Sequence, residues 1–262
     1  MRNILLTLSY LGTRYHGFQV QKNALSVAQV LQDAMETLLG RREDIKGCSR
    51  TDAGVHASFY CVSFRTESDL PLFRIQRGLN GLLPWDISVQ ECREVPEDFH
   101  ARYSSRGKRY RYRIWNSPAR SPFWEGRAYA YYPPLDLEKA RAVCAAYEGR
   151  HDFSAFCSAG CDVANTVRTI YRCGVEREGS LVTFTVEGDG FLYNMVRIMV
   201  GTMFWVNEGK LSVQEIPELL QGAERRRAGR TAPAQGLYLD RVFYDMDGFR
   251  REGGDDGGTG AY

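Results

Sequence analysis

The order of periodic segments along this chain, which occurs twice, constrains its fold more than any other feature. Alternating apolar residues predict strands, and apolar residues spaced three and four apart predict helices. The elements expected in the first half are, in chain order, strand 3–10, helix 26–39, strands 44–49 and 57–65, helix 71–83 and strand 87–95. Ser26 with Gln29 forms a capping box, and Gly40 marks the end of the first helix.

The second half repeats this order, which predicts a duplicated architecture. Its expected elements are strand 108–115, a helix that Asp136 caps and that ends before Gly149, strands 166–176 and 181–187, helix 191–207, a short helix 212–221 and strand 237–245. Two β-α-β-β-α-β units predict an α+β fold of two ferredoxin-like or RRM-like halves. Their sheets should be largely antiparallel, with the helices on one face. We expect subdomains at 1–104 and 105–248, and a glycine-rich disordered tail at 249–262.

The segment 48–57, C-S-R-T-D-A-G-V-H-A, concentrates the residues best suited to chemistry. It places Arg50, Thr51 and Asp52 in a row, followed by Gly54. A carboxylate beside a cation is expected to stay ionised, and a glycine permits a sharp turn or the close approach of a ligand. Two interpretations remain open: a reactive aspartate, or a turn in which Asp52 caps a helix.

The strand 108–115, K-R-Y-R-Y-R-I-W, alternates between aromatic and basic residues. Tyr110 should lie on one face, and Arg109 and Arg111 on the other. Tyrosines on an exposed sheet stack on nucleobases, while arginines reach phosphates. The pattern is equally typical of a half-buried strand with its tyrosines in the core.

The helix expected at 191–207 is apolar nearly all round and carries a single charge, Arg197. It is shorter than the roughly 20 apolar residues of a membrane span, so we expect it to be buried in the protein. A buried arginine needs a partner, because an uncompensated buried charge costs several kcal/mol. Asp52 is our candidate partner, and Glu187 or Asp189 is the alternative.

Net charge is only +2, but basic residues gather locally. The stretch 100–127 holds one acid, Glu125, against eight bases: Arg102, Arg106, Lys108, Arg109, Arg111, Arg113, Arg120 and Arg127. Such a cluster is typical of nucleic-acid binding, or of a solvated charged face.

The seven cysteines predict no metal site. No segment resembling a signal peptide precedes them, so we expect reduced thiols in a cytoplasmic protein. Cys157 and Cys161 have no second pair of ligands at zinc spacing.

Taken together, three of these motifs resemble those of the tRNA pseudouridine synthase A family. R-T-D-A-G-V-H-A resembles its catalytic-aspartate motif, K-R-Y-R-Y its second motif, and the sequence from Phe191 to Arg197 its F-L-x-x-M-V-R motif. The similarity extends from about Leu5 to Tyr244. Two departures are Ser49, where the family usually has glycine, and Tyr60, where glutamine is common.

The resemblance implies the pseudouridine synthase fold and an isomerase, an intramolecular transferase. Its substrate would be uridine at positions 38, 39 and 40 of the tRNA anticodon stem-loop. Asp52 would be catalytic, Tyr110 would stack on the flipped base, and Arg197 would pair with Asp52. Arg50 would help to extrude the nucleotide. We expect RNA contacts from Arg50, Thr51 and Tyr110 of these motifs, and from Arg106, Arg109 and Arg111 of the basic cluster. The resemblance also implies a homodimer without metal or cofactor.

Two rival functions remain open at this point. One is an RNA-binding protein without turnover, which would not need Asp52 together with a lone arginine in an apolar helix. The other is a glycoside or nucleoside hydrolase, which would require a second carboxylate near Asp52. No acidic motif near Asp52 predicts one.

Overall fold

The computed structural model describes residues 1–160 and 163–245, so the tail expected at 249–262 lies outside the described residues. The first half has the expected order of elements. These are β1 (Arg2–Tyr10), α1 (Val27–Leu39), β2 (Ile45–Gly47), β3 (His56–Thr66), α2 (Leu72–Leu82) and β4 (Ile87–Glu94). Helix α1 begins and ends where its caps predict: the Ser26 hydroxyl accepts from Gln29 N, and Gly40 is left-handed with φ of 77°.

The second half contains the same six elements and three short additions. The six are β5 (Ser105–Trp115), α3 (Leu137–Tyr147), β8 (Val167–Glu178), β9 (Leu181–Gly188), α4 (Met195–Asn207) and β10 (Leu237–Tyr244). The additions are β6 (Tyr129–Ala130), β7 (Gly149–Asp152) and α5 (Ile216–Leu219). The short strands β6 and β7 were not expected from the sequence.

Both halves use the same strand order, which confirms the duplicated fold. The first half runs β4-β1-β3 with β2 on β3, and the second runs β10-β5-β9-β8; neighbours within each of these two runs are antiparallel. The halves do not keep separate sheets. Strands β3 and β10 pair in parallel through Tyr238↔His56 and Leu239↔Ala57, which makes one ten-stranded sheet. The predicted division at 104/105 therefore falls within a continuous sheet and stays a prediction.

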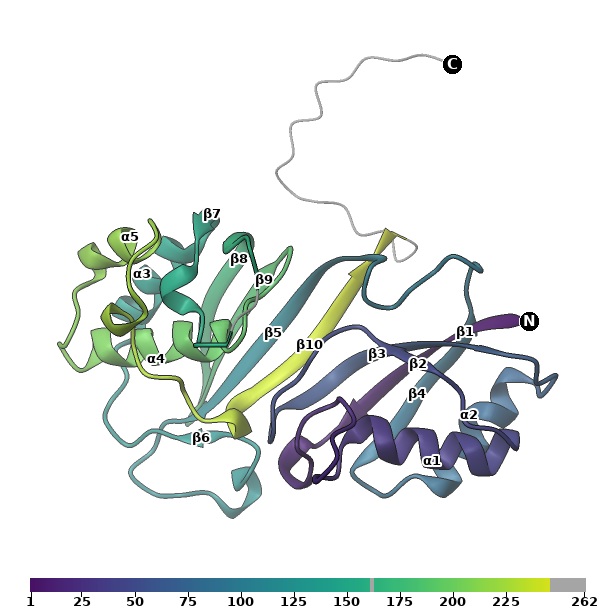
Figure 1. Ribbon diagram of the computed structural model, residues 1–262. Coiled ribbons are helices and arrows are strands. Elements are labelled where there is room, and N and C mark those ends of the chain that lie inside the picture. The colour runs from purple at the N-terminus through teal and green to yellow at the C-terminus, as the bar shows by residue number, and fades with distance from the viewer. Residues whose placement is uncertain (161–162, 246–262) are drawn as a thin grey trace, which may run out of the picture.

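The helices form two groups along this sheet (Figure 1). Helices α1 and α2 lie together beside the strands of the first half, and α3, α4 and α5 lie beside those of the second. Leu31 and Met35 of α1 and Ile75 and Leu79 of α2 are fully buried, as their spacing predicts. Helix α4 is buried nearly all round and packs against α3 and β5.

Two expected helices differ from the structure at their boundaries. The helix expected at 191–207 begins only at Met195, because Asn194 adopts a left-handed conformation with φ of 62°. The segment expected as helix 212–221 is a 3-10 turn followed by the single α-turn of α5, although its capping box of Ser212 and Glu215 is complete. The segment still buries Ile216, Leu219 and Leu220, and 3-10 turns are frequent at helix ends and as connectors.

The segment 228–232 lies directly against α4 because two glycines allow close approach. A Cβ on Gly201 of α4 would overlap the carbonyl oxygen of Arg230, and one on Gly229 would overlap the backbone of Gly201. The Gly229 amide also donates to the Thr202 hydroxyl (2.9 Å). This contact brings the backbone of Ala232 to Arg197, whose carbonyl oxygen accepts from Ala232 N (3.1 Å).

His56 joins the two halves at the start of β3. Its side chain is fully buried; Nδ1 accepts from Gly12 N (2.9 Å) and Nε2 contacts the Gln235 carbonyl (3.1 Å). The first bond requires an unprotonated Nδ1, so Nε2 carries the proton and donates. Burial lowers the pKa of His56 to about 4. His56 is therefore a structural hydrogen-bonding residue and not an acid or base at neutral pH.

The cysteines bear on the expectation that the thiols are reduced. Cys48, Cys61, Cys92, Cys144 and Cys173 are not in disulfide bonds. Cys157 is disulfide-bonded, so the expectation that all thiols are reduced is wrong at this residue.

Within residues 1–160 and 163–245, no helix is long and apolar enough to span a membrane.

We predict that Gly201→Ala destabilises the fold by about 2 to 3 kcal/mol, because the methyl group forces 228–232 away from α4. The matched control is Gly81→Ala in α2, where a Cβ meets nothing within 4 Å. That change should raise stability by up to about 1 kcal/mol through helix propensity. Urea unfolding of both variants measures the difference, and equal stabilities would contradict close packing at Gly201.

We also predict that stability falls as pH drops from about 6.5 to about 4. In this window the unfolded chain binds a proton on His56 that the folded protein does not bind, so unfolding becomes easier as pH decreases. The full effect is on the order of 3 kcal/mol. Urea unfolding across this range should show a shallower pH dependence in His56→Gln than in wild type. An unchanged slope in His56→Gln would refute the assignment.

Candidate active site

The loop 48–55 carries Asp52 between β2 and β3 and forms a tight turn. Val55 N donates to the Asp52 carbonyl (3.1 Å), and Gly54 has φ of 78°, a conformation that favours glycine. Gly54 N also donates to the Tyr15 carbonyl (3.1 Å). No helix begins in this loop, so the helix-capping interpretation of Asp52 is wrong. Its carboxylate is 30% exposed and free to meet a ligand.

Arg197 of α4 reaches this carboxylate from the other half of the chain. Its Nη1 lies 3.3 Å from Oδ2 of Asp52 and also donates to Oδ1 of Asn194 (2.8 Å). Its Nε donates to the Ala232 carbonyl (2.7 Å). The guanidinium is only 17% exposed, so the predicted partner of this buried charge is confirmed.

The alternative partners of Arg197 are occupied elsewhere. Glu187 accepts from Nε of Arg109 (2.6 Å), and Asp189 accepts from the backbone of Thr169 (3.0 Å). The ion pair across the two halves is therefore a specific feature of α4 and the 48–55 loop.

Two opposing effects set the charge on Asp52. Burial raises the pKa of its carboxyl group, and the nearby Arg197 guanidinium lowers it; burial is the larger effect, so the pKa lies above its ordinary value. The sequence predicts that Arg50 keeps this group ionised. Among the described residues, the guanidinium that pairs with Asp52 is that of Arg197, while the Arg50 side chain is exposed.

Three tyrosines from three strands hold the loop from the side of the sheet. The Tyr10 hydroxyl of β1 contacts the Thr51 hydroxyl (2.9 Å), and the Tyr110 hydroxyl of β5 contacts that of Ser49 (3.3 Å). The Tyr60 hydroxyl of β3 donates to the Ser49 carbonyl. The two departures from the family pattern, Ser49 and Tyr60, are thus in direct contact with each other.

Tyr110 is buried, with its hydroxyl against Ser49 of the Asp52 loop, and is not part of an exposed platform. It is 6% exposed and packs edge-on against Phe191, with ring centroids 5.0 Å apart. Burial raises its pKa above the ordinary value of a tyrosine, and the nearby Asp52 charge acts in the same direction. The phenol is therefore protonated at neutral pH and can donate a hydrogen bond.

Three of the basic residues predicted to bind RNA, Arg106, Arg109 and Arg111, pair with carboxylates other than Asp52. Arg109 pairs with Glu187, and Arg111 with Asp240 (3.3 Å), on the face of β5 opposite to Tyr110. Arg106 pairs with Asp245 (2.7 Å). Of the predicted contacts, the structure brings together Thr51 and Tyr110 with Asp52 and Arg197, and leaves Arg50 exposed on the same loop.

Sequence reasoning missed the residues that orient Arg197. Asn194 stands at a variable position of the motif F-L-x-x-M-V-R, and the role of Ala232 belongs to its backbone. Only the single charge of the helix indicated that such partners had to exist.

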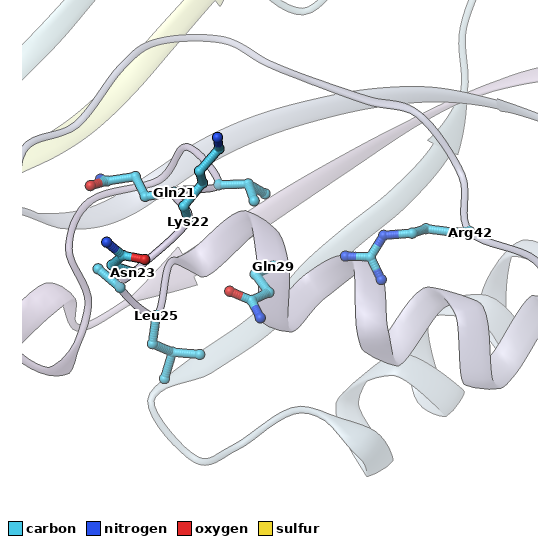
Figure 2. Close-up of a pocket in the computed structure, with 8 residues that line it drawn as sticks. Gln21, Lys22, Asn23, Leu25, Gln29 and Arg42 are labelled. Carbon is cyan, nitrogen blue, oxygen red and sulfur yellow. The ribbon is translucent and has the colours of Figure 1, made fainter.

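Two hollows of the surface lie away from this site. One of about 390 Å³ is lined by residues 20–25, Gln29 and Arg42 on the outside of the first half (Figure 2). The Arg42 charge there is paired with Asp33 and Glu36. Another, also about 390 Å³, lies between Trp85 and Arg127. Asp52, Tyr110 and Arg197 line neither of them.

The geometry suits chemistry by a single carboxylate. Within the described part of the chain, no cluster of three His, Cys, Asp or Glu could hold a metal ion. A partly desolvated carboxylate with one guanidinium and one phenol beside it can act as a nucleophile or as a general base.

Comparisons with known proteins identify the family. The family model described as tRNA pseudouridine synthase matches residues 7–104 and 143–245. The tRNA pseudouridine synthase A of Ruminiclostridium cellulolyticum is 47% identical over 245 residues, which cover 93% of this chain and 100% of the relative. That of Acetivibrio thermocellus is 48% identical over 244 residues, covering 93% and 100%. That of Myxococcus xanthus is 47% identical, covering 93% and 92%.

A solved Cbf5-Nop10-Gar1 complex aligns with 90% of this chain and 48% of the matched chain, with a TM-score of 0.38 and 14% identity. That likeness is too distant to contribute to the assignment, which rests on the family model and the curated relatives. This chain belongs to the tRNA pseudouridine synthase family.

Proposed function

We propose that this protein isomerises uridine to pseudouridine in tRNA, at positions 38, 39 and 40 of the anticodon stem-loop. The observation that carries the proposal is the half-buried Asp52 carboxylate, paired with Arg197 and lying beside Tyr110. Membership of the family supports the substrate class, and the stem-loop positions follow from the resemblance in the motifs.

The reaction leaves the elemental composition of the nucleotide unchanged. The N1–C1′ bond breaks, the uracil turns, and C5 forms a new bond to C1′. C5 then loses its hydrogen as a proton, and N1 carries a proton in the product. No water is consumed and no electrons are exchanged with another molecule, so we propose that neither metal nor cofactor takes part.

Asp52 would act once the target nucleotide leaves the RNA stack and enters the site. It either adds to the sugar as a nucleophile or removes the C2′ proton as a general base. Both roles need the ionised carboxylate, which Arg197 favours against the effect of burial. The routes differ in whether the C2′–H bond breaks, so only the second gives a primary deuterium isotope effect at C2′.

Tyr110 would contribute both its ring and its hydroxyl group. The ring would pack against the flipped uracil, as it now packs against Phe191. The protonated phenol would exchange hydrogen bonds with the base and assist removal of the C5 proton through a relay. Its raised pKa supports a role as a donor in the resting enzyme.

Among the predicted RNA contacts, we propose the largest role for Arg50. It is exposed on the same loop as Asp52, so it can enter the helix where the nucleotide leaves. Thr51 would position this loop through Tyr10. We still propose phosphate contacts for Arg106, Arg109 and Arg111. Each is paired with a carboxylate, so the RNA must displace that carboxylate or bind despite its negative charge.

The oligomeric state and the cellular location are proposed from the resemblance. We propose a homodimer that modifies tRNA in the cytoplasm. Light scattering of the purified protein tests the dimer, because a monomer and a dimer of a 29.8 kDa chain differ clearly in mass.

We predict that Asp52→Asn lowers kcat by a factor of about 10² to 10⁴, because the amide can neither add to the sugar nor accept its proton at a useful rate. The fold should be kept, since the amide oxygen still accepts from Arg197. Release of tritium from tRNA labelled at C5 of uridine measures turnover. Asp136→Asn, which preserves the cap of α3, is the matched control and should remain fully active.

The same assay separates the rival functions. Pseudouridine formed by Asp52→Asn at the wild-type rate would remove Asp52 from the mechanism. Tight tRNA binding by wild type without pseudouridine would identify an RNA-binding protein without turnover. Free uracil in the product would identify a hydrolase.

We predict that Tyr110→Phe lowers kcat about tenfold or more while tRNA affinity stays near wild type, because the ring is kept and the hydroxyl is lost. Tyr110→Ala should weaken both. The matched control is Tyr112→Phe on the same face of β5, which loses only a bond to the Pro233 carbonyl (2.7 Å) and should keep kcat. Full activity of Tyr110→Phe would show that the Tyr110 hydroxyl has no role in turnover and serves only in its contact with Ser49.

A further inference from the structure

Asn194 has an unusual backbone conformation immediately before α4. With φ of 62° and ψ of 6°, it is the one non-glycine residue with positive φ in the described part of the chain. Left-handed backbone is unfavourable for residues with a side chain, although asparagine tolerates it better than most. A residue kept in this conformation without being glycine indicates that its side chain has a use.

That use is not the ordinary one at the start of a helix. An asparagine in this position usually accepts from the free amides of the first turn, but the Asn194 side chain makes no such bond. Its Oδ1 instead accepts from Nη1 of Arg197 (2.8 Å), and its Nδ2 donates to the Ser158 hydroxyl (3.0 Å). These two contacts also fix which way the amide faces, because only the oxygen can accept from a guanidinium.

Ser158 holds this amide from a separate segment. Its backbone N donates to the Tyr193 carbonyl (3.2 Å), so the serine is anchored to the residue that precedes Asn194. The left-handed turn, the serine and the amide therefore form one connected unit at the start of α4.

The guanidinium of Arg197 needs more than one anchor to face Asp52. Its Nε bond to the Ala232 carbonyl fixes one edge of the group. Asn194 fixes Nη1, the same nitrogen that lies 3.3 Å from Asp52. Without the amide, rotation about the last bonds of the side chain would let Nη1 move away from the carboxylate toward water.

We propose that Asn194, held in place by Ser158, is a positioning residue that fixes Nη1 of Arg197 on the Asp52 carboxylate. Its effect on turnover rests on the proposed function, whereas its effect on the Asp52–Arg197 pair does not. Arg197 favours the ionised form of Asp52, so a loosened guanidinium leaves that carboxyl group easier to protonate.

The decisive variant is Asn194→Gly, because glycine keeps the left-handed turn and removes only the side chain. We expect kcat to fall about tenfold, the effect of losing one hydrogen bond to a charged group, with KM little changed. The acid limb of the pH–rate profile should move to higher pH. Ser158→Ala should change both in the same direction and less, because the amide remains but is free to turn.

Asn207→Gly is the matched control at the other end of α4. Asn207 also bonds neighbouring segments through its side chain, to the Tyr131 hydroxyl (3.1 Å) and the Pro134 carbonyl (3.0 Å), without touching Arg197. It should lose stability but keep the wild-type kcat and acid limb. If Asn194→Gly behaves in the same way, the amide has only a structural role and the proposal fails.

A direct measurement of Asp52 tests the proposal without turnover. The pKa of its carboxyl group, followed by carbon NMR, should be higher in Asn194→Gly than in wild type and unchanged in Asn207→Gly. A protein that forms no pseudouridine would refute the proposed function and leave this comparison intact. An unchanged pKa of Asp52 in Asn194→Gly would overturn the positioning role even in an active enzyme.

Discussion

The contact between Asp52 and Arg197 depends on the two halves of the chain being held in one fixed arrangement. The carboxylate belongs to a loop of the first half and the guanidinium to a helix of the second. Strands β3 and β10 share only two register pairs, so the ladder alone gives this junction few hydrogen bonds. His56 adds a buried side-chain link to each half, and it lies four residues after Asp52. A charge pair of this kind is sensitive to displacement, because its energy depends on separation and on desolvation together.

On each side of the pair, backbone groups and buried hydroxyls do most of the positioning. Tyr10, Tyr60 and Tyr110 hold the loop at Ser49 and Thr51. On the other side, the glycine contact between Gly201 and 228–232 brings the Ala232 carbonyl to Nε of Arg197. Groups that are themselves packed and hydrogen-bonded give a reactive carboxylate less freedom than flexible surface side chains would.

The sequence predicted the architecture well because apolar periodicity and caps act locally. Two β-α-β-β-α-β units were correctly expected, and Ser26 and Asp136 cap the helices predicted for them. The joining of both sheets through β3 and β10 depends on contacts between distant segments that no local pattern encodes. A carboxylate partner for Arg197 was predictable because a lone charge in an apolar helix requires a counter-charge, and the family resemblance favoured Asp52 over Glu187 or Asp189. The partners Asn194 and Ala232 were not, since one depends on an unusual φ and the other on a carbonyl that every residue possesses.

In the mechanism we propose, the balance between burial and charge at Asp52 gives a reason for the closely held guanidinium of Arg197. A carboxylate in water is well solvated and therefore a weak nucleophile, so partial burial makes it more reactive. The same burial favours the protonated form, which is inert, and already dominates the pKa of Asp52 without RNA. Bound tRNA would exclude more water and bring phosphate charges, and both effects raise that pKa further. Arg197 is the opposing influence within the site, and it acts only at short range. An enzyme that binds a polyanion over a buried carboxylate thus gains more from a rigidly held arginine than from a larger number of mobile surface cations.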